Sequence, residues 1–307
     1  MSAIGLGLAA LGRPGYLNLD HGVDLGSDRS VAALERRTHA VLDAAYEGGV
    51  RYFDAARSYG RAEQFLASWL SARELAPGSV EVGSKWGYTY TAGWRVDADP
   101  PEVKDLSVET LRRQLAETRA LLGPWLSLYQ IHSATLTSGV LEDRAVMEEL
   151  ERLRANGVAV GVTVTGAEQA ETIERVVGLA AFDSVQATFN LLERSTEPPL
   201  ERAHAAGMRV IVKEAVANGR LTARGTCRPL ERVAERLGTT PDAVAIAAVL
   251  ARPWTDVALS GAATPEQLRS NLAALTLDWS AELDGELADL SEPSERYWST
   301  RSELRWT

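Results

Sequence analysis

Short apolar runs alternate with longer stretches of helical periodicity along almost the whole chain, and this order of elements limits the fold more than any other feature. Such alternation is typical of βαβ units, whose strands lie parallel in one sheet. Eight strands are predicted at residues 4–11, 50–55, 80–86, 126–132, 158–164, 183–189, 208–214 and 256–261. Helical patterns fall at residues 31–49, 62–75, 108–123, 145–157, 168–178, 200–207, 230–238, 241–251 and 265–275.

Eight strand and helix pairs in about 280 residues fit one α/β domain, a (β/α)8 TIM barrel. We expect it to span residues 1–307, with a C-terminal helix and tail from about residue 280. An open doubly wound sheet is the alternative that the same alternation allows. The first strand runs into GLGLAALGRPG and a long loop, not into a helix-opening GxGxxG, so the barrel is favoured.

Composition narrows the classes of partner. The chain has a net charge of −10 and a pI of about 5.1, which opposes non-specific binding to nucleic acid or to an anionic membrane. The lone Cys227 cannot form an internal disulfide, and no apolar run reaches the roughly 20 residues of a membrane span, so a cytoplasmic protein is expected. No metal site is expected, because the four histidines lack ligand spacing. The oligomeric state stays open.

Four polar residues stand at or just beyond the predicted strand ends. Asp54, Lys85 and His132 close the second, third and fourth strands, and Tyr59 follows the second. Each alone has a structural explanation as a cap, a turn residue or a solvated tip. In a barrel, however, consecutive strands end side by side, so the four would meet in one pocket. A carboxylate, an ammonium, an imidazole and a phenol together form a proton-transfer set.

These residues lie in motifs that resemble the aldo-keto reductase superfamily. The matching stretches are FDAARSYG, VGSKWG, LYQIH, SVQATFNLLER and LSGAATPEQLRSNL. The resemblance runs from about residue 4 to residue 275. It implies a barrel, a nicotinamide cofactor extended across the C-terminal mouth, and a catalytic tetrad of Asp54, Tyr59, Lys85 and His132.

The resemblance also implies a role for each member of the tetrad. Tyr59 would be the general acid that protonates the carbonyl oxygen, and His132 would hydrogen-bond that oxygen. Asp54 would pair with Lys85, whose ammonium would lower the pKa of the Tyr59 phenol by favouring phenolate. Arg57 lies in the same loop, and a solvated loop cation is the expectation for it.

The cofactor would be held without GxGxxG. The helix after the eighth strand begins with Thr264 and Pro265, and the free N–H groups of such a helix end suit a phosphate; a merely well-capped helix is the alternative. Family habit favours NADP(H), with NAD(H) possible, although Gly261 and Gln267 stand where a Lys or Arg often binds the 2′-phosphate. Lys213 or Glu214 replaces the usual stacking aromatic. The candidate cofactor contacts are Thr163, Gln186, Lys213, Glu214, Ser260, Gly261, Thr264, Gln267, Arg269 and Asn271.

Aromatic residues cluster in the loop after Lys85 and in the tail. Trp86, Tyr88, Trp94 and Trp298 are the main candidates for the rim of a substrate pocket, together with Tyr297 and Trp306. Such a pocket suits an apolar or planar carbonyl compound. For the tail, packing onto the barrel is an equal alternative.

Three functions fit this pattern. The leading one is an NAD(P)H-dependent oxidoreductase, of the carbonyl reductase or alcohol dehydrogenase type, that acts on a small aldehyde or ketone. A lyase in which Lys85 forms a Schiff base is the second. The third is a non-catalytic, cofactor-sensing subunit of the same fold.

Overall fold

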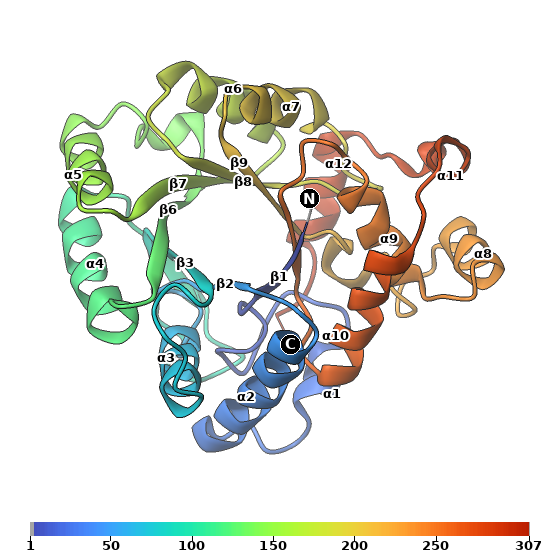
Figure 1. Cartoon of the computed structure of the whole chain (residues 1–307), viewed down its shortest axis with the longest axis horizontal. Coiled ribbons are helices and arrows are strands. Elements are labelled where there is room, and N and C mark those ends of the chain that lie inside the picture. Colours follow the sequence, from blue (N-terminus) through green and yellow to red (C-terminus); the bar gives the residue numbers. More distant parts are fainter. Residues whose placement is uncertain (1–2, 307) are drawn as a thin grey trace.

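The computed structural model describes residues 3–306, and its centre is a closed barrel of parallel strands ringed by helices (Figure 1). Around the barrel the order is β1-β10-β9-β8-β7-β6-β3-β2. The strands are β1 (Ala3–Gly7), β2 (Tyr52–Asp54), β3 (Glu81–Trp86), β6 (Leu126–Ala134), β7 (Ala159–Val164), β8 (Ser184–Thr188), β9 (Arg209–Lys213) and β10 (Val257–Ser260). Because β1 pairs with both β2 and β10, the sheet has no free edge. The predicted barrel is therefore confirmed, and the open sheet is excluded.

The outer helices follow the predicted pattern to within about three residues at each end. They are α2 (Val31–Glu47), α3 (Ala62–Ala72), α4 (Val108–Leu122), α5 (Arg144–Ala155), α6 (Gln169–Leu179), α7 (Glu197–Ala205), α8 (Arg228–Arg236), α9 (Pro241–Leu250) and α10 (Pro265–Leu272). Several begin at side-chain caps, such as Ser30, Ser107 and Asp143, that accept a hydrogen bond from the first turn. Across residues 3–306, no helix combines the length and the hydropathy that crossing a membrane requires.

Several short elements were not predicted. They are helix α1 (His21–Leu25), the antiparallel strands β4 (Tyr88–Tyr90) and β5 (Glu102–Lys104), and the 3-10 turns at Leu136–Ser138 and Ala217–Gly219. The end of the helix predicted at residues 265–275 is the 3-10 turn Ala273–Thr276, and the expected C-terminal segment includes the 3-10 turn Ala288–Leu290. The expected C-terminal segment forms α11 (Ala281–Glu286) and α12 (Ser294–Ser302). The first strand ends at Gly7, four residues earlier than expected, because Leu8–Leu11 forms a hydrogen-bonded turn.

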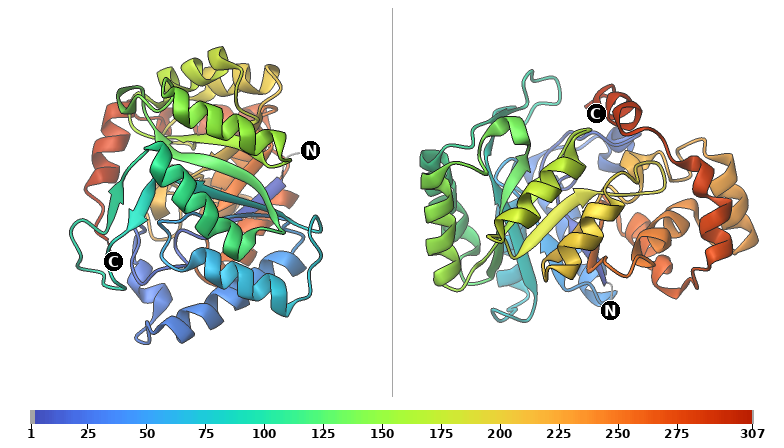
Figure 2. Two further views of the ribbon diagram at one scale, coloured as in Figure 1. Left: turned by 90° about the vertical axis from the view of Figure 1, so that its left-hand side faces the viewer. Right: turned by 90° about the horizontal axis from the view of Figure 1, so that it is seen from above.

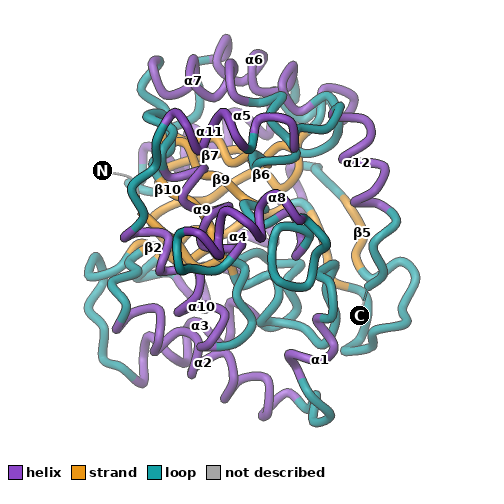
Figure 3. The backbone as a smooth tube through the Cα atoms, turned by 90° about the vertical axis from the view of Figure 1, so that its right-hand side faces the viewer, coloured by secondary structure: helices purple, strands orange, loops and turns teal. Residues whose placement is uncertain are grey.

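The tail packs onto the barrel and also reaches its mouth. Tyr297 of α12 is fully buried in an apolar cluster with residues of α8, α9 and α11, including Leu230, Val244 and Leu283. Figures 2 and 3 both show α12, the β4–β5 hairpin and the C-terminus at the end of the barrel opposite the N-terminus. The packing alternative therefore holds for part of the tail, while the rest borders the C-terminal mouth.

Inside the barrel, an apolar layer lies beneath the polar strand ends. Its members are Tyr52, Leu128, Ile211, Val257 and Leu259. A Cβ atom on Gly5 or Gly83 would overlap the Tyr52 side chain, so glycine leaves room for the ring in the narrow interior. This placement lets the Tyr52 hydroxyl reach the strand end above it.

The loop that carries Tyr59 is tied to its neighbours by a buried carboxylate. Glu63, in the first turn of α3, accepts hydrogen bonds from Ser84 (2.6 Å) and Thr118 (2.8 Å). It also forms an ion pair with Arg57. Arg57 also pairs with Glu117 at 2.8 Å, and its side chain is only 23% exposed. The expectation of a solvated loop cation is thus wrong. Arg57 fixes the β2–α3 loop against α4.

Replacing Glu63 with alanine tests this network. Glu63→Ala should lower the free energy of unfolding by about 3 kcal/mol, because it leaves Arg57, Ser84 and Thr118 without their shared acceptor. Urea denaturation followed by circular dichroism measures the loss. Glu148→Ala, which removes an exposed i,i+4 pair with Arg144, is the control and should cost only about 0–1 kcal/mol. Equal losses in the two variants would contradict the network.

Candidate active site

A buried ion pair forms the floor of the site. Asp54 at the end of β2 and Lys85 in β3, which were predicted to pair, are 2% and 1% exposed and form a direct ion pair. The Lys85 ammonium also donates to the backbone carbonyl of Ala55 at 2.9 Å. Two adjacent strands therefore hold the charges in register.

Further side chains satisfy the remaining lone pairs of the carboxylate. Asp54 Oδ1 accepts hydrogen bonds from Tyr52 Oη at 3.1 Å, Gln186 Nε2 at 3.1 Å and Gln130 Nε2 at 3.4 Å. Gln186 thus contacts Asp54 as well as the cavity, where it was expected to meet the cofactor. Tyr52 and Gln130 were not predicted, because nothing in the sequence distinguishes inward polar residues in β2 and β6 from core residues.

Tyr59 and His132 lie face to edge above this floor. Their ring centres are 5.5 Å apart with an interplanar angle of 81°, and Tyr88 approaches His132 from another side at 5.0 Å. Burial and then the Lys85 cation hold the pKa of His132 well below its usual value. The imidazole is therefore neutral at physiological pH.

The phenol of Tyr59 is a weaker acid than the sequence suggested. Burial and the Asp54 carboxylate raise its pKa, and Arg13 opposes them. Lys85 Nζ lies 4.9 Å from the centre of the Tyr59 ring but is engaged by Asp54 and Ala55. The expected lowering of the Tyr59 pKa by Lys85 is thus outweighed, and Tyr59 remains protonated at neutral pH.

Arg13 is a site residue that sequence reasoning missed. It is 2% exposed, and its guanidinium lies 5.3 Å from the centre of the Tyr59 ring, 5.2 Å from Tyr16 and 4.4 Å from Trp306. Its charge is balanced by Glu102 of β5 at 3.0 Å. No local pattern could reveal this residue, since its partners come from both ends of the chain.

The backbone beside Tyr59 leaves no room for side chains. A Cβ atom on Gly12 would overlap the Tyr59 carbonyl oxygen, and Gly60 has a φ of 61°, which favours glycine. The Arg61 amide also donates to the Gly12 carbonyl at 2.7 Å. The loop after β1 therefore fixes the position of the loop that carries the phenol.

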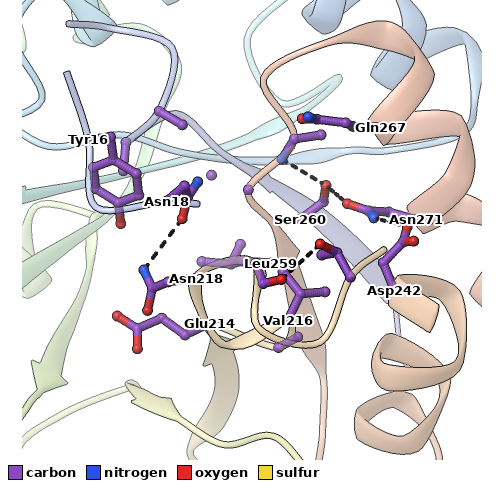
Figure 4. A pocket seen from close by; sticks show the side chains of 18 of the residues that line it. Tyr16, Asn18, Glu214, Val216, Asn218, Asp242, Leu259, Ser260, Gln267 and Asn271 are labelled. Atoms are coloured by element: carbon purple, nitrogen blue, oxygen red, sulfur yellow. Dashed lines mark hydrogen bonds between the residues drawn. The ribbon is translucent and has the colours of Figure 1, made fainter. Parts of the chain in front are cut away.

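One cavity runs from this floor toward the start of α10 (Figure 4). Of the ten predicted cofactor contacts, seven line it: Gln186, Lys213, Glu214, Ser260, Gly261, Gln267 and Asn271. Asp54 and Tyr59 line it as well.

The other three predicted contacts do not line this cavity and have other partners. Thr163 Oγ1 accepts a hydrogen bond from the Ser133 amide at 2.7 Å, and Thr264 caps α10 through the Gln267 amide at 3.2 Å. Arg269 pairs with Glu266 at 2.8 Å, and its side chain is 64% exposed. Arg269 therefore points to solvent, not to the place expected for a 2′-phosphate.

The α10 end of the cavity is built from amides, hydroxyls and acids. Ser260 Oγ donates to Asn271 Oδ1 at 2.7 Å, and Asn271 Nδ2 donates to Asp242 Oδ2 at 2.7 Å. Gln267 Nε2 donates to Asp24 Oδ1 at 2.9 Å. The sequence did not reveal Asp24 and Asp242 as site residues, because Asp24 belongs to α1 and Asp242 to α9, which are far along the chain from the Gln267 and Asn271 side chains that they contact.

Two loops far apart in sequence meet over the cavity. The Leu19 amide donates to the Asn218 carbonyl at 3.1 Å, and the amide side chains of Asn218 and Asn18 lie 3.4 Å apart. Arg224 pairs with Asp24. Figure 4 shows Asn18 and Asn218 facing one another at the cavity wall.

The end of β9 presents two charged residues, Lys213 and Glu214, at the position where the sequence lacks the usual aromatic. Glu214 adopts a left-handed φ of 58°, pairs with Arg301 at 2.6 Å and accepts from Tyr297 Oη at 3.2 Å. Burial acts to raise the pKa of Glu214, but Arg301 and Lys213 outweigh it and lower the pKa to about 2. Lys213 donates to Thr188 Oγ1 at 2.8 Å, and burial lowers its pKa to about 8.

The predicted rim aromatics divide into two groups. Tyr88 faces His132, and the Trp298 ring lies 5.6 Å from Lys213, so both border the site. Trp86 and Tyr297 are fully buried and cannot form the rim. Strand alternation explains Trp86: Lys85 points into the barrel, so the next residue points outward into the helical layer.

Trp94 also departs from the expectation. It donates from Nε1 to the Arg29 carbonyl at 2.7 Å and lines a second cavity with Arg57, Arg61 and Tyr90. Trp94 is therefore not a wall of the cavity that contains Tyr59.

The lining of the main cavity fits a nicotinamide dinucleotide. Hydroxyl and amide groups gather at the α10 end, Gly261 leaves open space there, and the Asp54, Tyr59 and Gln186 side chains stand at the other end. Polar groups of these kinds suit ribose and amide hydrogen bonding.

Comparison with known proteins agrees with this architecture. The model of the "Aldo/keto reductase family" matches residues 3–290. The chain is similar to the uncharacterized oxidoreductase YqkF of Bacillus subtilis, with 24% identity over 80% of this chain and 84% of the relative. It is 26% identical to a D-threo-aldose 1-dehydrogenase of a Pseudomonas species over 60% of this chain and 61% of that protein.

Solved structures show the same fold. A glycerol dehydrogenase of Gluconobacter oxydans superimposes with a TM-score of 0.72 at 20% identity, covering 94% of this chain and 90% of that one. An aldo-keto reductase of Bacillus halodurans gives 0.71 at 19% identity, covering 94% and 92%. With a family match over nearly its full length, the chain belongs to the aldo/keto reductase family.

Proposed function

We propose that the protein is a nicotinamide-dependent oxidoreductase that reduces a small aldehyde or ketone to an alcohol. The observation that carries this proposal is the edge-to-face contact between Tyr59 and a neutral His132 beside the buried Asp54–Lys85 pair. Two similar proteins are named as dehydrogenases, of D-threo-aldose and of glycerol, which supports redox chemistry on a small carbonyl or alcohol.

The chemistry needs a hydride at the carbonyl carbon and a proton at the oxygen. The reduced nicotinamide supplies the hydride with its electron pair when it is bound. Tyr59 Oη gives its proton to the carbonyl oxygen and becomes a phenolate, which the nearby Arg13 and Lys85 cations stabilise. The neutral His132 offers an N–H that orients the same oxygen.

The buried ion pair argues against the lyase alternative. A Schiff base requires an uncharged amine that is free to attack the substrate. The Lys85 ammonium is 1% exposed and is held by the Asp54 carboxylate and the Ala55 carbonyl. No specific contact favours the cofactor-sensing alternative. The proposal places this activity in one barrel domain of residues 1–307, in the cytoplasm.

The cavity favours NAD(H) over the NADP(H) expected from family habit. Its charged lining consists of Asp24, Asp54, Glu214, Asp242, Lys213 and Arg224. Asp24, Asp54 and Glu214 are each paired with a cation, whereas Asp242, within residues 3–306, has no cation within 4 Å and makes the α10 end acidic. Arg224 is already paired with Asp24, and Arg269 points to solvent. A 2′-phosphate would add about two negative charges to this acidic lining.

Tyr59→Phe tests the general acid. The change should lower kcat for carbonyl reduction by about 10²- to 10⁴-fold, because the proton donor is lost while the ring remains. NADH oxidation with a panel of aldehydes and ketones measures the loss, and tryptophan fluorescence should show cofactor affinity within about twofold of the parent. Tyr46→Phe, at the C-terminal end of α2, is the matched control. Unchanged turnover in Tyr59→Phe would refute the assignment.

Cofactor preference is tested by binding. Fluorescence titration should give a dissociation constant for NADH about tenfold lower than that for NADPH, because the acidic lining disfavours the additional phosphate. Asp242→Asn should narrow this ratio by about threefold, since it removes one charge and keeps the shape. Asp97→Asn, 71% exposed in the β4–β5 hairpin, should leave the ratio unchanged. Tighter binding of NADPH by the parent protein would overturn the preference.

A further inference from the structure

Three carboxylates around Tyr59 and His132 are each neutralised by a cation of their own. Each pairs with a different cation: Asp54 with Lys85, Glu102 with Arg13, and Glu214 with Arg301. The three pairs come from different parts of the chain, and each is at least partly buried. Within residues 3–306, none of these three carboxylates is left to balance further positive charge beside His132.

Two lysines at the same mouth remain without a partner acid. Within residues 3–306, neither Lys104 nor Lys213 has a carboxylate oxygen within 4 Å of its ammonium. Lys104 Nζ donates to the carbonyl of Ser133, the residue after His132, at 2.7 Å and lies 5.7 Å from the Tyr88 ring centre.

Lys213 approaches from the opposite side of the barrel. It ends β9, which lies across the barrel from β3, and it lines the cavity together with Tyr59. Its ammonium lies 5.6 Å from the Trp298 ring centre. Lys213 donates to Thr188 Oγ1, and both ammonium groups lie close enough to His132 to act on its charge. They therefore flank the imidazole beside which a substrate carbonyl would bind.

The distribution of lysine strengthens this observation. Only three of the 32 Lys and Arg residues in the chain are lysines, and all three, Lys85, Lys104 and Lys213, surround His132. The whole chain carries a net charge of −10, so a local surplus of two positive charges is opposite in sign to the charge of the protein as a whole. Lys213 is half-buried and Lys104 lies at the exposed edge of the mouth, so an anion bound between them would offset the charge of both.

We propose that the enzyme selects carbonyl substrates that carry an acidic group, a carboxylate or a phosphate, and that Lys104 and Lys213 bind that group. The proposal rests on the proposed function, because it treats this mouth as the substrate site. Lys213 lines the cavity that leads to α10, whereas Lys104 lies on the β4–β5 hairpin outside it, so we assign an anion bound by both lysines to the substrate and not to the cofactor.

Three planar aldehydes test the selection: benzaldehyde, 4-carboxybenzaldehyde and 4-formylphenyl phosphate. We expect kcat/KM for at least one anionic compound to exceed that for benzaldehyde by about tenfold or more, as charge-assisted hydrogen bonds allow. Whether the carboxylate or the phosphate gains more identifies the acidic group. Lys104→Gln and Lys213→Gln should each reduce the anionic-to-neutral ratio by about tenfold. Arg73→Gln, beyond the C-terminal end of α3, removes a charge at the opposite end of the barrel and should leave the ratio unchanged.

The pH dependence provides a second readout. Lys213 faces Glu214, Arg301, Lys85 and Asp54, and burial is the main cause of its pKa of about 8. The ammonium is charged below this pH and neutral above it, whereas a benzoate stays ionised throughout. The preference for 4-carboxybenzaldehyde should therefore decline between about pH 7 and pH 9, and Lys213→Gln should abolish that decline.

Two results would overturn the proposal. One is a parent protein whose anionic-to-neutral ratio is near or below one, and the other is a ratio that neither lysine substitution changes. If no aldehyde is reduced at all, the proposed function fails, and the anion site is judged by binding alone. Benzoate and phenyl phosphate should then still quench tryptophan fluorescence in the parent and not in Lys104→Gln or Lys213→Gln. Absence of binding to the parent would reject the site itself.

Discussion

The buried ion pair between Asp54 and Lys85 is the interaction on which the site depends. A carboxylate and an ammonium at the bottom of the barrel mouth are stable only if each is balanced and hydrogen-bonded. Tyr52, Gln130 and Gln186 supply the remaining bonds to Asp54, so residues from four strands converge on one carboxylate. The same contacts that satisfy this charge hold the strand ends in register, which links the closure of the barrel to the geometry of the mouth.

Much of this arrangement could be predicted from the sequence. Parallel strands whose order is known must end at the same face, so Asp54, Lys85 and His132 could be brought together without coordinates. Local patterns could not reveal contacts between distant segments. Arg13 packs against Trp306, Asp24 reaches Gln267 across the cavity, and the β4–β5 hairpin is too short to stand out. Trp86 was misplaced although period-two alternation after the inward Lys85 carried the correct signal.

Charge is divided unequally along the mouth. Asp24 and Asp242 stand at the α10 end, whereas Lys104 and Lys213 stand around His132. Burial favours the uncharged form of two groups of the site. It raises the pKa of Tyr59, which keeps the phenol protonated, and lowers the pKa of His132, which keeps the imidazole neutral. Both are the forms that proton donation to a carbonyl oxygen requires. The electrostatic character of the site thus follows from which side chains the barrel removes from water.

The position of α12 in the chain separates two requirements of the structure. All eight barrel strands precede α12, and the helix takes no part in the pairing of the sheet. Arg301, which neutralises Glu214, and Trp306, which packs against Arg13, nevertheless complete the surroundings of the mouth. Closing the barrel therefore needs the strands alone, whereas completing the mouth also needs contacts between segments that are far apart in the chain.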